Sequence, residues 1–355
     1  MAFDDILGQE RALGSLRAAL RRGALHHAYL FGGPAGTGKG SAARVLAQAA
    51  NCDRGDRVDE PCGECGPCRK IARGVHPDVF VLSDERSMVK AGRWEARGGR
   101  SPSKDIVVDQ VRDLVDHRLA MKRVEGRRRF VVIDPADAMN VQAQNALLKT
   151  LEEPPEVTTD VLVASSPDAL LPTIRSRCAR VTFAPLPDAL VAERLQKEGR
   201  GAEEARLAAA LAAGSLGRAL ELDTKELGAV REALTAAAAL DARDARAWLG
   251  FAAEHGKDRE RARELCELLL VWLRDVVAVQ AAADDAPLAL GGLAPETARA
   301  AAAISPAEVL RRREAVRRTI AALRQNAVAT LALERMLIEW FAPTEGGGRA
   351  ESPRF

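Results

Sequence analysis

The segment between residues 28 and 50 places the strongest constraint on the fold. An apolar run at residues 28–31 leads into the glycine-rich sequence GGPAGTGK at residues 32–39, and a helical pattern resumes afterwards. Glycines in such a loop let backbone N–H groups converge on phosphate oxygens, while a lysine adds a positive charge. Strand, glycine loop and helix in this order predict a phosphate-binding loop, although a purely structural glycine-rich turn is the plainer alternative. The candidate binding residues are Gly33, Gly36, Gly38 and Lys39.

Apolar runs and helical patterns alternate through the first half of the chain. Further apolar runs lie at residues 79–82, 130–133, 161–164 and 181–183. This alternation is typical of a mostly parallel sheet covered by helices, so we predict an α/β domain over residues 1–186. Residues 83–105 are rich in Gly, Ser, Arg and Lys and lack apolar periodicity, which predicts an exposed, mobile insertion.

After residue 187 only helical patterns remain, with a break near residues 223–227. We therefore expect helical domains at residues 187–223 and 224–342, followed by a disordered tail at 343–355. In the second of these domains, apolar residues at 265, 268, 269, 272, 273 and 276 form a wide helical stripe. Such a stripe needs helical partners, which other subunits or the domain's own core would provide.

Charge and hydropathy exclude several classes of protein. The 52 basic and 50 acidic residues nearly cancel, so nucleic-acid affinity would have to come from a local patch. The first five residues contain two acids, Asp4 and Asp5, where a signal peptide would carry basic residues, and Glu267, Arg274 and Asp275 interrupt the most apolar later stretch. We expect a cytoplasmic protein without a membrane span.

Two groups needed for ATP hydrolysis are missing. A phosphate loop of this kind carries Ser or Thr after the lysine to hold Mg²⁺, but the chain has Gly40, and Ser41 is rotated by about 100° on a helix. The strand at 129–133 ends in Asp134, which could reach a metal, but Pro135 stands where such ATPases place a glutamate. We predict little or no ATP hydrolysis. The alternative is an active ATPase in which displaced groups such as Asp137 act instead. Whether ATP still binds stays open.

Four cysteines lie close together in the sequence. Their spacing, Cys-x9-Cys-x2-Cys-x2-Cys, supplies enough thiolates to close a tetrahedral zinc site, and four protein ligands leave no position open for catalysis. We predict a structural zinc ion, with an iron–sulfur cluster or free thiols as alternatives. Cys178 and Cys266 are expected to be small core residues. The candidate metal ligands are Cys52, Cys62, Cys65 and Cys68.

Several motifs together resemble a known family. They are HAYLF at residues 27–31, the four-cysteine module, NALLKTLEEPP at 145–155 and SRC at 176–178. Over most of residues 3–341 the chain resembles the clamp-loader subunits of bacterial DNA polymerase III, which belong to the AAA+ superfamily. The resemblance implies a RecA-like AAA+ domain at 1–186 with a zinc module at 52–68, a helical lid at 187–223 and a helical collar at 224–342.

The resemblance also implies roles for two arginines. In this family the arginine of the SRC motif, here Arg177, reaches across a subunit boundary to the ATP of a neighbour. Arg218 resembles the second-sensor arginine of AAA+ lids, although a solvated helix arginine is the plainer alternative. With Asp134, Arg218 would complete a degenerate nucleotide site. Within the family an intact site marks the ATP-hydrolysing gamma/tau subunits, whereas a degraded site resembles the stator subunit, and Gly40 and Pro135 favour the stator.

The implied partners are the gamma/tau and delta subunits, together with the sliding clamp and primer–template DNA, which are reached through the complex. A stator would assemble the ring and would not add nucleotides itself. Two rival hypotheses stay open. One is a gamma/tau-type ATPase, and the other is a zinc-bearing DNA-binding module, motivated by the basic runs at 311–313 and 317–318, which are otherwise a solvated helix face.

Overall fold

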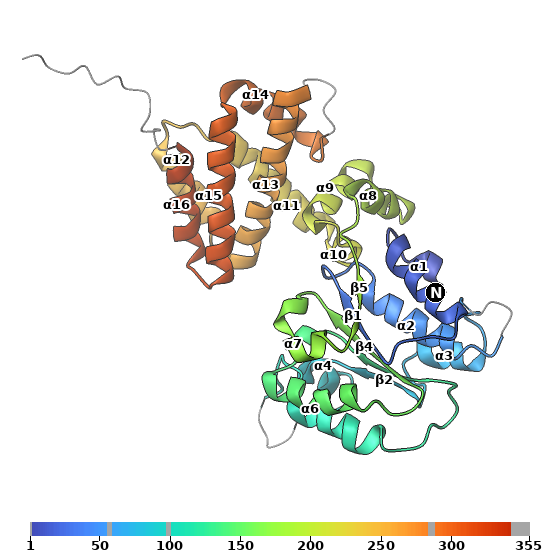
Figure 1. Cartoon of the computed structure of the whole chain (residues 1–355). Coiled ribbons are helices and arrows are strands. Elements are labelled where there is room, and N and C mark those ends of the chain that lie inside the picture. Colours follow the sequence, from blue (N-terminus) through green and yellow to red (C-terminus); the bar gives the residue numbers. More distant parts are fainter. Residues whose placement is uncertain (1, 55–58, 97–100, 283–287, 342–355) are drawn as a thin grey trace, which may run out of the picture. The chain divides into compact units, whose positions relative to one another are not determined.

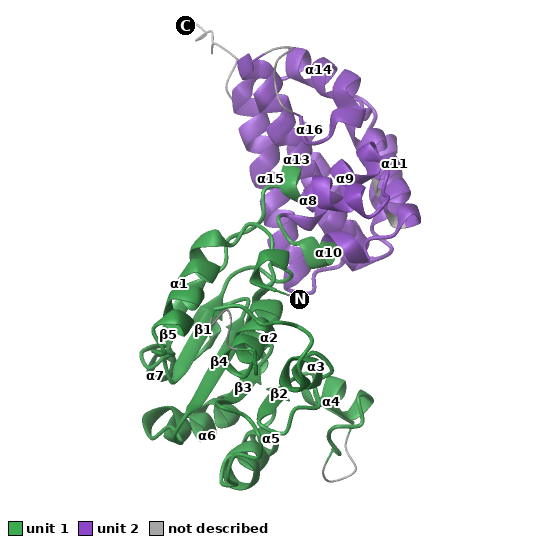
Figure 2. Cartoon of the chain, turned by 90° about the vertical axis from the view of Figure 1, so that its right-hand side faces the viewer, with its two compact units in different colours: residues 1–190, 214–218 green, residues 191–213, 219–355 purple. Residues whose placement is uncertain are grey.

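The computed structural model describes residues 2–54, 59–96, 101–282 and 288–341 (Figure 1). The chain divides into two compact units (Figure 2), residues 1–190 with 214–218 and residues 191–213 with 219–355. The tail expected at 343–355 lies outside the described residues.

The first unit contains a five-stranded, wholly parallel sheet with the order β2-β3-β4-β1-β5. Its strands are β1 (Ala28–Gly32), β2 (Val79–Leu82), β3 (Arg129–Ile133), β4 (Thr158–Ala164) and β5 (Ala179–Thr182). Each predicted apolar run forms a strand, so the expected parallel α/β architecture is confirmed. Because β1 pairs with both β4 and β5, the glycine loop that follows it lies at the carboxyl ends of the central strands, where ligands bind in such sheets.

Both faces of this sheet are buried, as expected for parallel strands. Phe31 and Phe130 pack in one core with residues of α1 (Glu10–Arg21) and α2 (Lys39–Ala50). Leu30 and Ile133 point to the other face and pack with helices α5, α6 and α7. The remaining helices of this unit are α3 (Gly66–Ala72), α4 (Glu85–Lys90), α5 (Val108–Arg112), α6 (Val141–Glu152) and α7 (Pro172–Arg175), with single turns at Phe3–Asp5, Asp113–Arg118, Ala136–Ala138 and Pro167–Ala169.

The insertion predicted at 83–105 is largely exposed in its described part, as expected, but it contains a helix, α4, that the sequence pattern did not predict. Asp84 caps α4 by accepting a hydrogen bond from the Ser87 N–H at 3.0 Å. Glu85 is buried and accepts hydrogen bonds from Trp94 Nε1 at 3.3 Å and from the Ser103 N–H at 2.8 Å. The segment around α4 is held by polar contacts with one buried carboxylate. Contacts of this kind do not produce an apolar period in the sequence.

The described residues of the second unit form helices and no strand. These helices are α8 (Asp188–Lys197), whose first residues belong to the first unit, α9 (Ala202–Ala212), the end of α10 (Leu216–Glu221), α11 (Thr224–Ala238), α12 (Ala245–His255), α13 (Arg259–Ala282), α14 (Ala294–Ala303), α15 (Pro306–Arg324) and α16 (Ala329–Phe341), with a single turn at Gly291–Leu293. The predicted apolar stripe lies on α13, where Leu268, Trp272 and Val276 are buried against helices of the same unit. The stripe is therefore core, which is the second of the two alternatives expected for it, and not a subunit contact.

Within the described residues, no helix is both long enough and apolar enough to cross a membrane.

Candidate nucleotide site and metal centre

The glycines of the phosphate loop are required by close backbone packing. Gly33 has φ +148°, and a Cβ atom there would lie 2.1 Å from the carbonyl oxygen of Phe183. Gly38 has φ +92° at the start of α2, and a Cβ atom there would lie 2.8 Å from Ile6 Cγ2. Both glycines thus hold the loop between β1 and α2 in a shape that other residues would not adopt.

Lys39 is directed onto its own loop. Its Nζ donates hydrogen bonds to the carbonyl oxygens of Gly33 at 2.6 Å and Pro34 at 2.5 Å. The residue is only 4% exposed, and burial lowers the pKa of its ammonium group, while the nearby Asp134 and Asp137 carboxylates oppose that shift. In this conformation the donors of Lys39 are used by backbone carbonyls rather than directed at a phosphate.

The loop is covered by residues 214–218, which belong to the same compact unit. The Gly217 N–H donates to the Gly36 carbonyl oxygen at 3.1 Å. A Cβ atom at Gly36 would lie 2.0 Å from Ser215 Oγ, which itself accepts a hydrogen bond from the Arg218 N–H at 3.1 Å. The structure therefore brings the predicted residues Gly36 and Arg218 into one region. It also adds Ser215 and Gly217, whose part in closing the loop no sequence pattern indicated.

Asp134 lies directly against the position that lacks the Mg²⁺-binding hydroxyl. A Cβ atom at Gly40 would meet Asp134 Oδ2 at 2.5 Å, so the carboxylate takes the room of the missing side chain. Burial raises the pKa of Asp134, whereas Lys39 and Arg44 oppose the shift. The Asp134 carboxylate therefore occupies space that a Ser or Thr side chain at position 40 would need.

Asp137, the alternative water-orienting acid, is already bonded elsewhere. Its Oδ2 accepts hydrogen bonds from the backbone N–H groups of Ser165 at 3.0 Å and Ser166 at 2.8 Å. These bonds tie the turn after β3 to the end of β4. A carboxylate held in this way serves the connection between two strands and is poorly placed to take a proton from water.

Arg177 lies between α7 and β5, and its described partners are outside the phosphate loop. One guanidinium nitrogen donates to the Thr173 carbonyl oxygen at 2.9 Å, and the other pairs with Glu152 Oε1 at 2.8 Å. The side chain is 35% exposed. The ion pair with Glu152 was not foreseen, because these residues are distant in sequence and no local pattern joins them.

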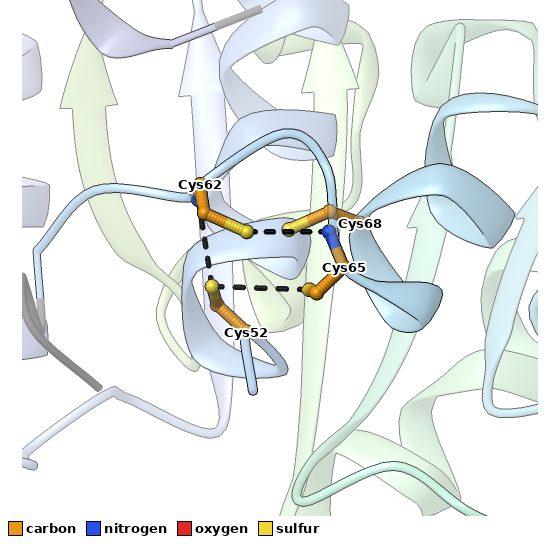
Figure 3. Close-up of side chains that lie close together, drawn as sticks. All are labelled: Cys52, Cys62, Cys65 and Cys68. Atoms are coloured by element: carbon orange, nitrogen blue, oxygen red, sulfur yellow. Dashed lines mark hydrogen bonds between the residues drawn. The ribbon is translucent and has the colours of Figure 1, made fainter. Parts of the chain in front are cut away.

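The four predicted cysteines come together in one cluster (Figure 3). Their sulfur atoms all lie within 4.8 Å of one another, and the Cys52 and Cys65 sulfurs are 4.0 Å apart. Zn–S bonds of about 2.3 Å in a tetrahedron require sulfur separations of about 3.8 Å. Cys52 follows α2 and the Cys65–Cys68 pair begins α3, so the cluster fits a metal ion that would join these two helices.

Backbone donors surround the thiols of the cluster. The Cys62 N–H donates to Cys52 Sγ at 3.4 Å, and the Cys65 N–H donates to Cys62 Sγ at 3.3 Å. Although burial opposes it, backbone N–H groups of Glu64 and Cys65 lower the pKa of Cys62 to about 6, whereas burial raises the pKa of Cys68. Donors of this kind favour thiolate, the form that binds metals.

Cys178 and Cys266 are buried away from the cluster, as predicted. Sequence reasoning missed a buried acid near the first of them. Asp160 on β4 is 1% exposed, and among the described residues its Oδ1 has no hydrogen-bond partner. Burial raises the pKa of Asp160 to about 7. Asp160 follows two threonines and precedes the apolar run at 161–164, and no local sequence pattern shows that it is buried.

Three of the five arginines in the basic runs of α15 pair with acids of the same unit. Arg311 and Arg312 contact Glu308 at 2.7 Å and 2.9 Å, and Arg318 contacts Glu339 at 2.8 Å. Two of these three arginines share one carboxylate, so the local positive charge is only partly compensated.

Relatives of known identity match about half of this chain. It is 44% identical over 163 residues to the DNA polymerase III subunit delta' of Pseudomonas aeruginosa, covering 46% of this chain and 44% of that protein. It is 36% identical over 196 residues to the subunit tau of Bacillus subtilis (55% and 31%) and 37% identical over 226 residues to the subunit tau of Escherichia coli (62% and 32%). The chain thus spans less than half the length of each of these relatives.

Among solved structures, a DNA polymerase III gamma subunit-related protein from Thermotoga maritima matches 93% of this chain and 98% of its own, at 18% identity and a TM-score of 0.36. The family model described as DNA polymerase III, delta subunit, matches residues 8–187, which is half of the chain. The chain therefore belongs to the DNA polymerase III delta subunit family of clamp-loader proteins.

Proposed function

We propose that this chain is the delta-prime, or stator, subunit of a bacterial DNA polymerase III clamp loader. It assembles in the cytoplasm with gamma/tau and delta subunits and donates Arg177 to the ATP site of a neighbour. In this way it helps to place the sliding clamp on primer–template DNA during replication. The observation that carries the proposal is the state of its own phosphate loop, in which Asp134 fills the space beside Gly40 and Lys39 bonds to loop carbonyls.

Hydrolysis by this chain would need three changes at once. Lys39 would have to leave its two carbonyl acceptors, the turn at Ser215–Gly217 would have to move off Gly36, and a hydroxyl would have to replace the hydrogen of Gly40. Pro135 would still be unable to orient a water molecule. Since the lost metal ligand and base each normally contribute orders of magnitude in rate, the chain acts as a scaffold that completes another subunit's site.

The placement of Arg177 supports its role in trans. The guanidinium is partly exposed and lies away from the phosphate loop of its own chain, bonded to Thr173 and Glu152. A guanidinium that assembly brings to a neighbour's γ-phosphate would stabilise charge on the transferred phosphoryl group. Arg218, on the segment that covers the loop, would then be a remnant of the second sensor in a nucleotide site that has closed.

For the cysteine cluster we propose a structural zinc ion held by Cys52, Cys62, Cys65 and Cys68. The separations of the sulfur atoms support it, and so does the complete set of four thiol ligands. Zinc would supply a cross-link between the end of α2 and the start of α3. For the domains, we propose that residues 1–186 form the AAA+ domain, residues 187–223 the lid and residues 224–342 the collar that joins the subunits.

The decisive experiment compares ATP turnover by the purified chain with turnover by a reconstituted loader. The chain alone with ATP and Mg²⁺ should show no turnover above background. In the loader, Arg177→Ala should reduce DNA- and clamp-stimulated turnover by about 10³-fold or more at the affected site, the usual effect of an arginine finger. Arg180→Ala, which removes an exposed arginine nearby on β5, should leave that turnover unchanged.

The same experiment tests the rival gamma/tau function, which is favoured by relatives named tau that are 36–37% identical. Brisk turnover by the chain alone would establish an ATPase and reject the stator proposal. Unchanged turnover in the Arg177→Ala loader would reject the finger role while leaving the scaffold role in place.

A further inference from the structure

The first unit contains a cavity of about 260 Å³ beside the phosphate loop. Its lining includes residues of α2, the end of α3, the neighbouring strands β2 and β3, and the segment after α4. Val79, Val81 and Val132 provide an apolar wall. Lys39 and the glycines at 33, 36 and 38 are not part of the lining, so the cavity adjoins the closed loop and shares only Gly40 and Asp134 with the candidate nucleotide site.

Three arginines from different elements line this cavity. Arg44 lies on α2, Arg73 ends α3, and Arg93 follows α4. The guanidinium of Arg93 lies over Gly74, with Nη2 3.0 Å from the position of a Cβ atom there. All three are exposed, and Arg44 interacts electrostatically with the Asp134 carboxylate. Single solvated arginines are common on proteins, but three around one cavity concentrate positive charge in a confined space.

The lining offers little negative charge to balance these arginines. Asp134, at the edge nearest Gly40, is its only carboxylate among the described residues. His76 is buried in the wall, and burial lowers the pKa of its imidazole, so the ring is neutral near pH 7. Its Nδ1 accepts from the Asp78 N–H at 3.1 Å, which places the proton on Nε2, and Nε2 lies 3.6 Å from the Glu125 carboxylate, which is not part of the lining. The cavity therefore carries a net positive charge and is rich in donors.

We propose that this cavity, formed around Arg44, Arg73 and Arg93, binds a phosphate group. Guanidinium groups match phosphate oxygens with pairs of N–H donors, and a bound dianion would relieve the repulsion between the three cations. A volume of 260 Å³ is below the range of drug-sized ligands and suits a small anion with part of what it is attached to. Phosphate of this kind comes either from a nucleic-acid backbone or from a free pyrophosphate or nucleotide.

Titration of the full chain with pyrophosphate, by calorimetry at low ionic strength, tests the site. The wild-type chain should bind saturably, and Arg73→Ala with Arg93→Ala should weaken binding by about tenfold or more, since charge-assisted hydrogen bonds are lost. Arg69→Ala is the matched control, because Arg69 is an exposed arginine on α3 outside the lining. Loss of exposed side chains should leave the melting temperature unchanged, which separates lost binding from lost folding.

Short duplex DNA, titrated at two salt concentrations, identifies the source of the phosphate. DNA binding that is salt-sensitive and lost in the Arg73→Ala, Arg93→Ala chain, but kept in Arg69→Ala, would assign a backbone phosphate to the cavity. Binding of pyrophosphate alone with the same dependence on the arginines would assign a free phosphate. The proposal is overturned if neither probe binds saturably, or if the double variant binds both probes as tightly as Arg69→Ala does.

Discussion

At the scale of single residues, two glycines at the phosphate loop, Gly33 and Gly40, differ in their structural role. Gly33 is required because the carbonyl oxygen of Phe183 occupies the space of a side chain, and its φ of +148° excludes most other residues. Gly40 adopts ordinary helical backbone, and its absent side chain has been replaced in space by the Asp134 carboxylate. Gly33 allows the shape of a phosphate loop, whereas Gly40 lacks the hydroxyl that would hold Mg²⁺ there.

Replacement of Gly33 measures how strongly the loop shape is built into the fold. Gly33→Ala should lower the free energy of unfolding by about 2–3 kcal/mol, since it adds both a backbone clash and an unfavourable φ. Gly14→Ala, in the middle of α1 with no heavy atom near the added Cβ, should be neutral or stabilising by up to about 1 kcal/mol. Urea unfolding of both variants checks this, and an equal effect of the two would contradict the close packing at Gly33.

Asp160 should make the stability of the chain depend on pH. Burial raises its pKa to about 7 in the folded state, against about 3.9 when unfolded, so the folded state holds the proton more tightly. Below pH 4 the carboxyl is protonated in both states and does not lower the free energy of unfolding. As the pH rises to about 7, Asp160 lowers that free energy progressively, by on the order of a few kcal/mol above pH 7.

Asp160→Asn should remove this decline and stabilise the chain at pH 8. Unfolding free energies of wild type and variant between pH 4 and pH 8 provide the measurement, with exposed Asp116→Asn as the control. Parallel pH profiles for wild type and Asp160→Asn would show that the carboxyl is ionised and compensated in the folded chain.

At the scale of secondary-structure elements, the ends of helices hold the groups that matter for assembly. Glu152, the last residue of α6, pairs with Arg177 just after α7, so two helices on one face of the sheet set the position of the proposed finger. Because both side chains are partly exposed, the pair is weak, in the range of about 0–1 kcal/mol. Such a contact can hold the arginine in the free chain and still release it to a neighbour's phosphate.

Glu152→Gln should therefore raise ATP turnover in a reconstituted loader, by up to about fivefold for a contact of 1 kcal/mol. The expected cause is that Arg177 no longer has to leave an ion pair before it reaches the neighbouring site. Glu153→Gln alters the next acid along the chain and should have no effect. A decrease in turnover for Glu152→Gln would mean that Glu152 positions the arginine productively instead of retaining it.

At the scale of the whole molecule, two compact units with separate cores should unfold separately. The cysteine cluster lies in the first unit only. Calorimetry of the zinc-loaded chain should show two transitions, and a chelator or Cys65→Ser should lower only one of them. Metal analysis should find about one zinc per chain for a four-thiolate site. A single transition that shifts as a whole would contradict the independence of the units, and absence of zinc would contradict the metal assignment.

Most of the fold was predictable because each strand is an apolar run bounded by turn residues, as at 28–31 and 130–133. Two features were not decided by the sequence, for related reasons. The segment around Glu85 is ordered by polar contacts to one buried carboxylate, and such contacts have no period in a sequence. The stripe that includes Trp272 is apolar enough for a subunit interface, but periodicity does not say whether the partner helix belongs to the same chain.

Residue types at short spacing were enough to indicate the phosphate loop, the loss of its hydroxyl at Gly40, the misplaced Pro135 and the four clustered thiols. These properties are local, because the chemistry of each depends on neighbours along the chain. Closure of the loop by Ser215 and Gly217, the Glu152–Arg177 pair and the arginine-lined cavity emerged only from folding. Each depends on contacts between segments far apart in sequence, and such contacts are set by how helices and strands pack.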